Sequence, residues 1–180
     1  MKAEKTLYLV RHAKSSWGQT DLDDSERPLN KRGKENAPDM AERLAHNVSQ
    51  NDGEFPRPEL IISSPAVRAS TTAYIIAKAL GLPNKNVVLD ERLYMRGTTA
   101  MLEALEEYGN QQTAIMIVGH NPDLTQLHNQ LNSLYIDNIP TCAIATIRFD
   151  IGDWHQLLSR GGVMVDFDYP KRCIHSANHS

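Results

Sequence analysis

The 180-residue sequence lacks several features that would point to particular classes of protein. It has only two cysteines, Cys142 and Cys173, and they form no CxxC or Cys/His metal-ligand spacing. We therefore expect buried free thiols in a reducing compartment. No apolar run is long enough to cross a membrane, and the four apolar residues before Arg11 are too few for a signal-peptide core. These absences predict a cytoplasmic protein with no membrane partner.

The sequence also has no excess of positive charge and none of the usual nucleotide-binding loops. Its formal net charge is -3, which gives no reason to expect nucleic-acid binding. Neither GxxxxGK[ST] nor GxGxxG follows the first predicted strand, so no nucleoside triphosphate or dinucleotide is expected. A local cationic pocket is compatible with this total, because the total does not show where the 19 Lys and Arg residues lie.

The sequence does contain short apolar runs that are each followed by a turn and a helical pattern. The runs cover residues 6–10, 59–64 and 113–119. Nearly continuous apolar strands that alternate with helices are typical of a parallel sheet covered on both faces. Residues 142–150 and 162–168 predict a C-terminal β-hairpin at the sheet edge. We expect one α/β domain over residues 1–180, a three-layer sandwich with its core at 6–172 and a disordered tail at 173–180.

Four helices are predicted, over residues 31–47, 65–80, 98–108 and 123–134. Ser64 is placed to cap the second helix, with Pro65 at its first position. Pro38 lies inside the first helix and is expected to kink it or to delay its start. The apolar side chains expected to face inward on the second and fourth helices are Val67, Thr71, Tyr74, Ile75, Ala79, Leu124, Leu127, Leu131 and Leu134.

Charged and ionisable side chains stand where the three predicted strands end. Arg11 and His12 follow the first strand, Arg68 lies in the first turn after the second, and His120 follows the third. Ligands of open α/β sheets bind beyond the carboxyl ends of the strands, and helical side chains lean toward the helix N-terminus. We therefore expect two arginines and two histidines to meet in one pocket at this edge.

Such a pocket has the chemistry of a phosphoryl-transfer site. Guanidinium groups beside helix N-termini bind anions, and the planar donors of arginine match phosphate oxygens. Because Arg11 and Arg68 should lower the pKa of a neighbouring imidazole, we expect His12 to be neutral near pH 7 and able to attack phosphorus. Charge stabilisation by the remaining donors needs no metal or other cofactor.

Three motifs in this order resemble the histidine phosphatase superfamily, which includes the cofactor-dependent phosphoglycerate mutases. They are RHAKSSW, SSPAVRASTTA and VGHNPDL. The segments ERPLNKRGK, DERLY and DFDYPKR are most similar to the SixA-type phosphohistidine phosphatases, and the resemblance covers residues 6–172. It implies a phosphoglycerate mutase-like fold, with His12 as the nucleophile that becomes phosphorylated and with Arg11, Arg68 and His120 as phosphate ligands.

The resemblance also implies further site residues. Arg27 matches a basic position near the phosphate, and Glu91 falls where larger members carry the acid that protonates the leaving group. Ser15 and Asn121, which belong to the first and third motifs, are candidates for substrate binding. Gly18 stands near a position where mutase-like members have asparagine, which argues against mutase activity.

Several functions are compatible with these residues. We favour a phosphatase that acts through His12 on phosphohistidine in a signalling or phosphorelay protein, because the short segment after Glu91 predicts an open pocket. A broad-specificity phosphomonoesterase and a non-enzymatic phosphate-binding module are the alternatives. A further reading makes His12 and His120 metal ligands together with Asp23 or Asp123, although Arg11 would repel a dication. The sequence does not indicate the oligomeric state.

Overall fold

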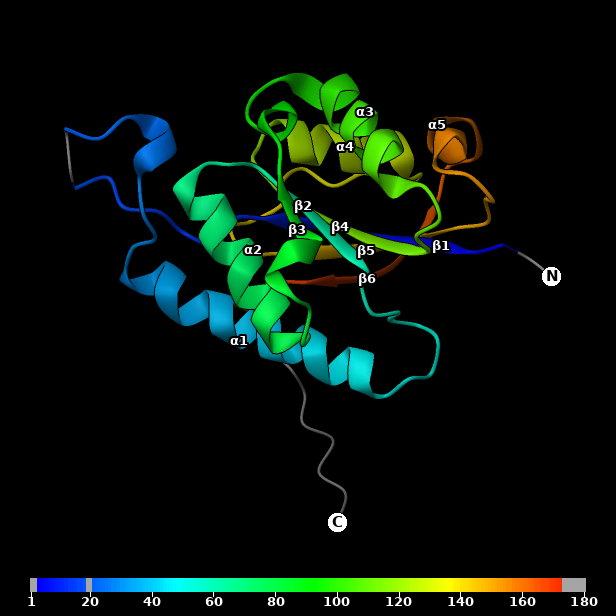
Figure 1. Ribbon diagram of the computed structural model, residues 1–180, viewed down its shortest axis with the longest axis horizontal. Coiled ribbons are helices and arrows are strands. Elements are labelled where there is room, and N and C mark those ends of the chain that lie inside the picture. Colours follow the sequence, from blue (N-terminus) through cyan, green and yellow to red (C-terminus); the bar gives the residue numbers. More distant parts are fainter. Residues whose placement is uncertain (1–2, 19–20, 173–180) are drawn as a thin grey trace, which may run out of the picture.

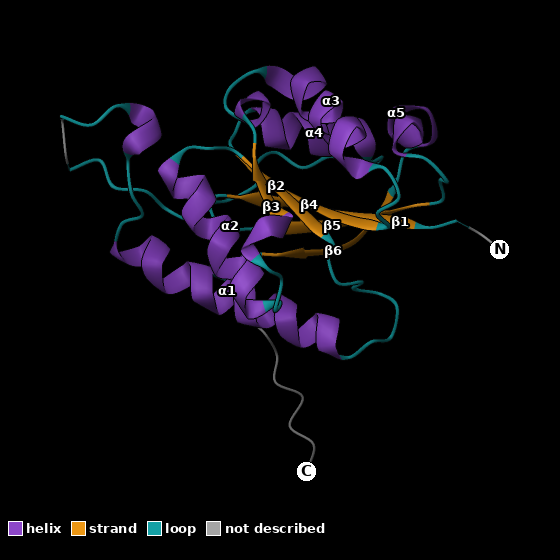
Figure 2. Cartoon of the chain, viewed as in Figure 1, coloured by secondary structure: helices purple, strands orange, loops and turns teal. Residues whose placement is uncertain are grey.

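The computed structural model describes residues 3–18 and 21–172, which form a six-stranded sheet with helices on both faces (Figures 1 and 2). The strand order is β3-β2-β4-β1-β5-β6. The first four of these are parallel neighbours, and the last two join them in antiparallel pairs. The strands are β1 (Lys5–Arg11), β2 (Leu60–Ser63), β3 (Val87–Leu89), β4 (Ala114–Gly119), β5 (Ile144–Phe149) and β6 (Val163–Asp168). The predicted α/β class and the C-terminal hairpin at the sheet edge are confirmed.

Two layers of helix enclose the sheet. Helices α1 and α2 lie on one face, and α3, α4 and the short α5 lie on the other (Figure 1). Their bounds are α1 (Lys31–Ser49), α2 (Val67–Ala79), α3 (Gly97–Gly109), α4 (Asp123–Leu131) and α5 (Leu157–Arg160). No helix within the described ranges has the length and apolar character needed to cross a membrane.

The central strand β1 supplies side chains to both hydrophobic cores. Leu7 and Leu9 belong to the core that contains the buried residues of α3 and α4, whereas Tyr8 and Val10 belong to the core beneath α1 and α2. This alternation follows from the two-residue period of a strand. Because both faces of β1 are buried, its middle residues have no contact with solvent. Polar side chains that need a partner or a ligand therefore come at its carboxyl end.

The buried face of α2 differs from the predicted one. Val67 and Tyr74 are exposed, and Leu134 is exposed beyond the end of α4. The buried stripe of α2 consists of Arg68, Ala69, Thr72, Ala73, Ile76 and Ala77. Alanines on this stripe allow α2 to pack closely, and the same rotation turns Arg68 inward. Ile75 and Ala79 pack, partly buried, against the core as predicted, so the prediction was wrong for Val67 and Tyr74.

The start of α1 supports the loop that follows the first strand. Asn30 caps the helix, because its side chain accepts a hydrogen bond of 2.8 Å from the Gly33 N–H. A Cβ at Gly33 would lie 2.1 Å from the carbonyl oxygen of Lys14, so only glycine permits this approach. The predicted delay of the helix start is wrong, since α1 begins at Lys31 and contains Pro38.

Two further expectations concern single segments. The short edge strand β3 was not predicted, because a run of three residues carries too little periodicity. Cys142 is a buried free thiol as expected, and burial raises its pKa to about 12. Cys173 and the predicted tail lie outside the described residues.

Candidate active site

The carboxyl ends of β1, β2 and β4 lie side by side and carry the predicted site. Beyond the strand ends, the His12 N–H donates to the Gly119 carbonyl at 3.1 Å, and the Ser64 N–H donates to the Val118 carbonyl at 2.9 Å. These two hydrogen bonds continue the sheet by one residue on each side of β4. They bring the loops that hold His12, Ser64 and His120 to one edge.

The two predicted histidines face one another at this edge. Their ring centroids are 5.0 Å apart, and His12 and His120 are only 8% and 2% exposed. The rings of Tyr94 and His120 pack edge to face, with centroids 5.3 Å apart. The predicted convergence of two distant segments on one site is therefore present in the structure.

His12 is held as a neutral ring with a defined tautomer. Its Nδ1 lies 2.7 Å from the carbonyl oxygen of Ala13, and a carbonyl can only accept, so Nδ1 carries the proton and Nε2 keeps its lone pair. Burial, with smaller contributions from the charges of Arg68 and Arg11, lowers the pKa of His12 to about 4. The sequence predicted the direction of this shift, but burial and not the arginines is its main cause.

His120 is oriented by Ser64. The Ser64 hydroxyl oxygen lies 2.7 Å from His120 Nε2 and also accepts the Ala66 N–H at 3.2 Å. If the hydroxyl proton goes to Nε2, the ring proton of His120 is on Nδ1. The expected helix-cap role of Ser64 is wrong, because α2 begins only at Val67 with Ala66 as its N-cap. Burial, followed by the charge of His12, lowers the pKa of His120 to about 3.

Donor atoms without partners gather around these rings. Buried polar atoms without a hydrogen bond are rare in proteins. Five buried side-chain N or O atoms in the described part of the chain have no partner, and three of them are Arg11 Nε, Arg68 Nε and His120 Nδ1. Three such atoms at one edge of the sheet indicate a site for an external anion.

Both arginines are fixed through their terminal nitrogens. Arg11 Nη1 donates to the Ile139 carbonyl at 2.9 Å. Arg68, which is 2% exposed, donates from Nη1 to the Asp24 carbonyl at 2.6 Å and from Nη2 to the Asp24 carboxylate at 2.9 Å. These bonds from terminal nitrogens set the direction of each guanidinium, and both Nε atoms are buried without a partner.

Arg27 and Ser15, both predicted at the site, contact each other. Arg27 Nη1 donates to the Ser15 hydroxyl at 2.8 Å, and Arg27 Nε donates to the Asp24 carboxylate at 3.0 Å. The guanidinium carbon of Arg27 lies 3.7 Å from the centroid of the exposed Trp17 ring. The charge of Arg27 also lowers the pKa of His12, although less than Arg68 and Arg11 do.

The side chains of Asn121 and Glu91 have partners within the chain and do not join the group of donors around the two histidines. The two amide protons of Asn121 go to Asn138 Oδ1 and to the Ile139 carbonyl, the same carbonyl that fixes Arg11. These bonds do not favour the predicted contact of Asn121 with substrate. Glu91 lies in the 3-10 turn η3 (Glu91–Leu93), is 77% exposed and pairs with Arg96 at 3.1 Å.

Three contributors to the site were not predicted, namely Asp24, Tyr94 and the hydroxyl of Ser64. Asp24 opens the 3-10 turn η1 (Asp24–Glu26), three residues before Arg27. An acidic residue at this spacing from Arg27 was visible in the sequence, but the spacing alone does not indicate that Arg68 would reach the same carboxylate.

The metal-site alternative has no matching ligand group. Within residues 3–18 and 21–172, no three His, Cys, Asp or Glu side chains are grouped so that they could hold a metal ion. Asp123 instead accepts a hydrogen bond of 2.9 Å from the Gly97 N–H at the start of α3, and Asp23 is exposed.

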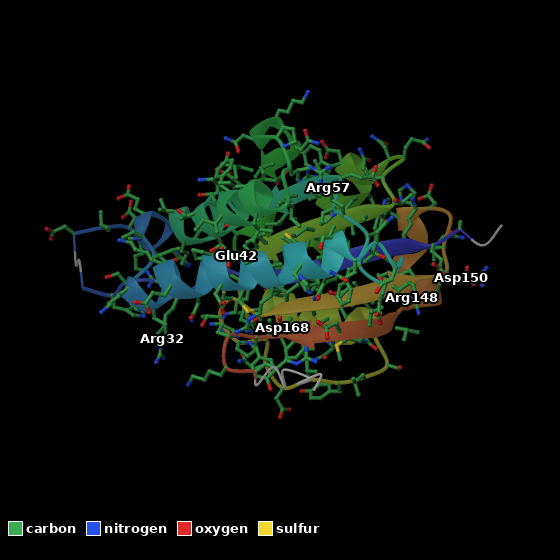
Figure 3. All side chains as sticks on the ribbon, turned by 90° about the horizontal axis from the view of Figure 1, so that it is seen from below. Arg32, Glu42, Arg57, Arg148, Asp150 and Asp168 are labelled. Carbon is green, nitrogen blue, oxygen red and sulfur yellow. The ribbon has the colours of Figure 1, made fainter. Side chains whose placement is uncertain are left out.

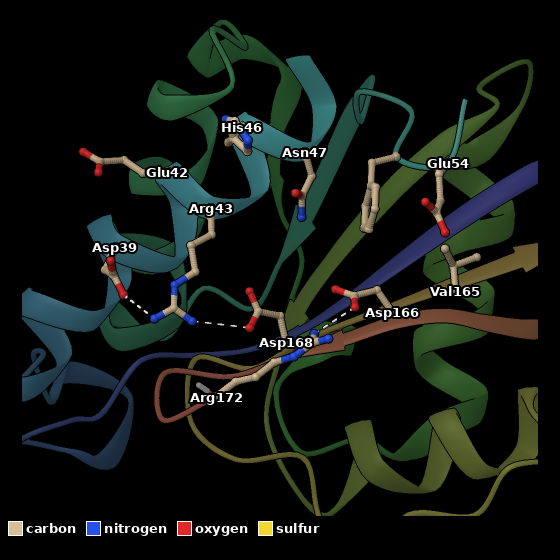
Figure 4. Close-up of a pocket in the computed structure, with 11 residues that line it drawn as sticks. Asp39, Glu42, Arg43, His46, Asn47, Glu54, Val165, Asp166, Asp168 and Arg172 are labelled. Carbon is tan, nitrogen blue, oxygen red and sulfur yellow. Dashed lines mark hydrogen bonds and ion pairs between the residues drawn. The ribbon is translucent and has the colours of Figure 1, made fainter. Parts of the chain in front are cut away.

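A separate hollow of about 800 Å³ lies between α1 and β6, and its lining is charged (Figure 4). Glu42 of α1 and Asp168 of β6 appear on this side of the molecule in Figure 3. Arg43 pairs with Asp39 at 2.9 Å and with Asp168 at 3.4 Å, and Arg172 pairs with Asp166 at 2.8 Å. Every arginine in this hollow has a carboxylate partner.

Comparison with known proteins agrees with the geometry. The sequence model of the histidine phosphatase superfamily (branch 1) matches residues 7–94. An uncharacterized chloroplastic protein of Arabidopsis thaliana is 30% identical over 166 residues, which cover 88% of this chain and 72% of that protein. The chain belongs to the histidine phosphatase superfamily. The phosphatase class predicted from the sequence is thereby confirmed.

Solved structures with the same fold include SixA-type proteins. A protein of Agrobacterium tumefaciens, provisionally described as the phosphohistidine phosphatase SixA, has a TM-score of 0.70 and 25% identity, with 92% of this chain and 98% of that chain covered. The protein histidine phosphatase SixA complexed with tungstate has a TM-score of 0.68 and 22% identity, with 92% and 97% covered. A phosphoglycerate mutase of Plasmodium falciparum has a TM-score of 0.60 and 18% identity, with 96% and 98% covered. The predicted phosphoglycerate mutase-like fold is confirmed.

Proposed function

We propose that this phosphatase works without a metal, through a covalent phosphohistidine on His12, and that it acts on phosphohistidine in a signalling or phosphorelay protein. The observation that carries the proposal is the neutral His12 ring beside the unpartnered Arg11 Nε, Arg68 Nε and His120 Nδ1. A nucleophile and three anion-binding nitrogens are the groups that phosphoryl transfer requires of a protein.

In the first step, the lone pair of His12 Nε2 attacks phosphorus. The Nε2–P bond forms while the bond from phosphorus to the substrate's leaving nitrogen breaks, and the bonding electrons stay with that nitrogen. The substrate ring carries a proton on its other nitrogen, so it leaves as neutral imidazole. The phosphorylated ring is positively charged and keeps its proton on Nδ1, where the Ala13 carbonyl at 2.7 Å stabilises it. Hydrogen bonds from Arg11, Arg68 and His120 stabilise the negative charge on the phosphoryl oxygens.

In the second step, water replaces His12 at phosphorus. The water oxygen forms a bond to phosphorus, the Nε2–P bond breaks, and the electron pair returns to Nε2. Inorganic phosphate is released and takes with it the oxygen of the water, while a water proton passes to phosphate or solvent. Because the pKa of His12 is about 4, the ring returns to its neutral nucleophilic form near pH 7.

Two features support a phosphorylated protein as substrate. Helix α3, which follows Glu91, packs beside α4 on the face of the sheet and does not extend over the strand ends (Figure 1). Glu91 is exposed and paired with Arg96, so it is poorly placed to protonate an alkoxide. An imidazole leaving group needs less help from an acid than an alkoxide does. The cytoplasmic location expected from the sequence stays a prediction.

Substrate preference and a nucleophile variant test the proposal. We expect faster single turnover of a phosphohistidine-bearing protein than of 3-phosphoglycerate or an alkyl phosphate, and no loss of rate with a chelator. His12→Ala should abolish turnover, whereas His46→Ala, which changes an exposed histidine on α1, should leave it unchanged. A preference for 3-phosphoglycerate would overturn the assigned substrate, and hydrolysis by the His12 variant would overturn the assigned nucleophile.

A further inference from the structure

A single carboxylate, that of Asp24, joins the groups around the anion site. Its Oδ1 accepts from Arg27 Nε at 3.0 Å and lies 2.9 Å from Arg27 Nη2. Its Oδ2 accepts from Arg68 Nη2 at 2.9 Å and from the hydroxyl of Tyr94. The backbone carbonyl of the same residue accepts from Arg68 Nη1 at 2.6 Å. One residue therefore contacts two arginines and a tyrosine.

Asp24 could act on substrate binding in two opposite ways. As an internal anion, it could occupy the guanidinium of Arg68 and have to leave before a phosphoryl group binds. Alternatively, it could hold that guanidinium in the direction that phosphoryl binding needs. The two readings predict opposite effects of removing the carboxylate, so they can be separated by experiment.

The hydrogen bonds favour the second reading. Asp24 holds both terminal nitrogens of Arg68, one through its side chain and one through its backbone. A planar guanidinium held at two nitrogens cannot turn in its plane, so the direction of its Nε is set. With Asp24 in this position, Arg68 Nε, Arg11 Nε and His120 Nδ1 are still without partners. The anion site is thus complete while Asp24 is in place.

The carboxylate is also unsuited to a direct chemical role. Its two oxygens already face donors from Arg27, Arg68 and Tyr94, which leaves it little capacity to accept a proton from water. The hydrogen bond from Tyr94, followed by those from Arg68 and Arg27, holds the pKa of Asp24 well below its usual range. It is ionised at working pH and cannot serve as an acid.

We infer that Asp24 is a positioning residue that directs Arg68 Nε, and through Tyr94 the ring of His120, toward the phosphoryl group. Tyr94 connects the two, because its hydroxyl donates to Asp24 while its ring and that of His120 pack edge to face. The inference rests on the proposed function for the identity of the anion. It assigns to the segment Asp24–Glu26 a task in substrate binding that the motif residues alone do not perform.

Equilibrium binding of tungstate and inorganic phosphate tests the inference, since it needs no turnover. We expect Asp24→Ala to weaken binding of both anions roughly tenfold or more, the loss typical of a misdirected charge-assisted hydrogen bond. Asp24→Asn keeps a side-chain oxygen for Arg68 and should recover part of the affinity. Asp23→Asn removes the same charge from the neighbouring exposed residue and should leave binding unchanged.

The kinetics of the same variants give a second readout. A positioning role predicts that kcat falls in Asp24→Ala and is partly rescued in Asp24→Asn. Thermal unfolding should show that both variants are folded. Unchanged or tighter anion binding in Asp24→Ala would overturn the inference and identify Asp24 as a competing anion. Failure of the proposed function is distinguishable, because an active His12→Ala enzyme would leave the effect of Asp24 on anion binding in place.

Discussion

Two clusters of arginine in this molecule differ in how their charges are matched. In the hollow between α1 and β6, Arg43 and Arg172 are surrounded by five carboxylates, and each has a carboxylate partner (Figure 4). At the ends of the strands, Arg27 and Arg68 share the single carboxylate of Asp24, and Arg11 donates instead to the Ile139 carbonyl. In the first cluster carboxylates outnumber the arginines, and the second is left with a positive excess.

Burial sharpens this difference. The side chain of Arg43 is 19% exposed and that of its partner Asp39 is 54% exposed, so water screens this ion pair and it contributes little to stability. Arg68 is almost fully enclosed, and its Nε is a buried donor without a partner, which is costly. A protein tolerates such a cost where an external anion completes the charge balance. A large charged hollow is therefore a weaker sign of function than a small set of buried donors without partners.

Removing one arginine from each cluster should produce the largest contrast. Arg68→Ala is expected to lower kcat/KM by about 10³-fold, the scale seen when a preorganised donor to a transition state is lost. Arg43→Ala should leave kcat/KM unchanged, because its partners lie in the other hollow. The measurement is steady-state hydrolysis of a phosphohistidine protein. A comparable loss in both variants would remove the distinction between the clusters.

The pH dependence should report the buried histidines. Because the pKa of His12 is about 4 in the folded protein, kcat/KM should be insensitive to His12 between pH 6 and 8 and fall about tenfold per unit below pH 4. The unfolded chain binds these protons near its ordinary pKa of about 6.5. The free energy of unfolding should therefore decrease as pH falls from about 6.5 toward 4. A kinetic pKa near 6.5 would contradict the neutral buried ring.

Gly33 tests how the helix α1 supports the loop after His12. Gly33→Ala places a Cβ 2.1 Å from the Lys14 carbonyl, and we expect a loss of roughly 1–3 kcal/mol in the free energy of unfolding. Gly18→Ala is the matched control, since a Cβ there would lie at an ordinary distance of 3.7 Å from Ser16. Denaturant unfolding measures both. Equal stability of the two variants would show that the loop moves aside without cost.

Substitution of Glu91 should have the smallest effect on activity, because Glu91, like the arginines of the hollow between α1 and β6, already has a partner of opposite charge. It is exposed and has its own arginine partner, Arg96. Because this pairing leaves Glu91 poorly placed as an acid, we expect Glu91→Gln to slow release of an alkyl alcohol only about twofold, far less than loss of a positioned general acid would, and to leave release of histidine unchanged. Glu103→Gln, an exposed site on α3, serves as the control. Equal slowing with both leaving groups would contradict this assignment.

The sequence predicted those site residues whose position is set by local secondary structure. Arg11 is the last residue of β1, and His12 and His120 directly follow β1 and β4, so the end of each apolar run marks their position. The loops that carry Asp24 and Tyr94 have no such periodicity, and their contact with Arg68 and His120 depends on how α2 and η3 pack. Contacts of that kind are set by tertiary structure and are not visible in local patterns.

The buried side of α2 also could not be predicted from local sequence patterns. Counting large apolar residues favoured Val67 and Tyr74, but the helix buries alanines and the functional arginine instead. Small side chains allow α2 to pack closely there, and the buried charge of Arg68 is paired with the carboxylate of Asp24. A hydrophobic pattern therefore predicts the existence of a helix better than it predicts the buried face of a helix that carries a catalytic residue.

Trapping the phosphorylated enzyme tests the central claim most directly. Rapid quenching during turnover of a labelled phosphohistidine protein, with a chelator present, should yield acid-labile, base-stable phosphate on a peptide that contains His12. The label should appear and decay at rates that account for the release of phosphate. Full hydrolysis with no label on His12, or a label on another residue, would contradict the account.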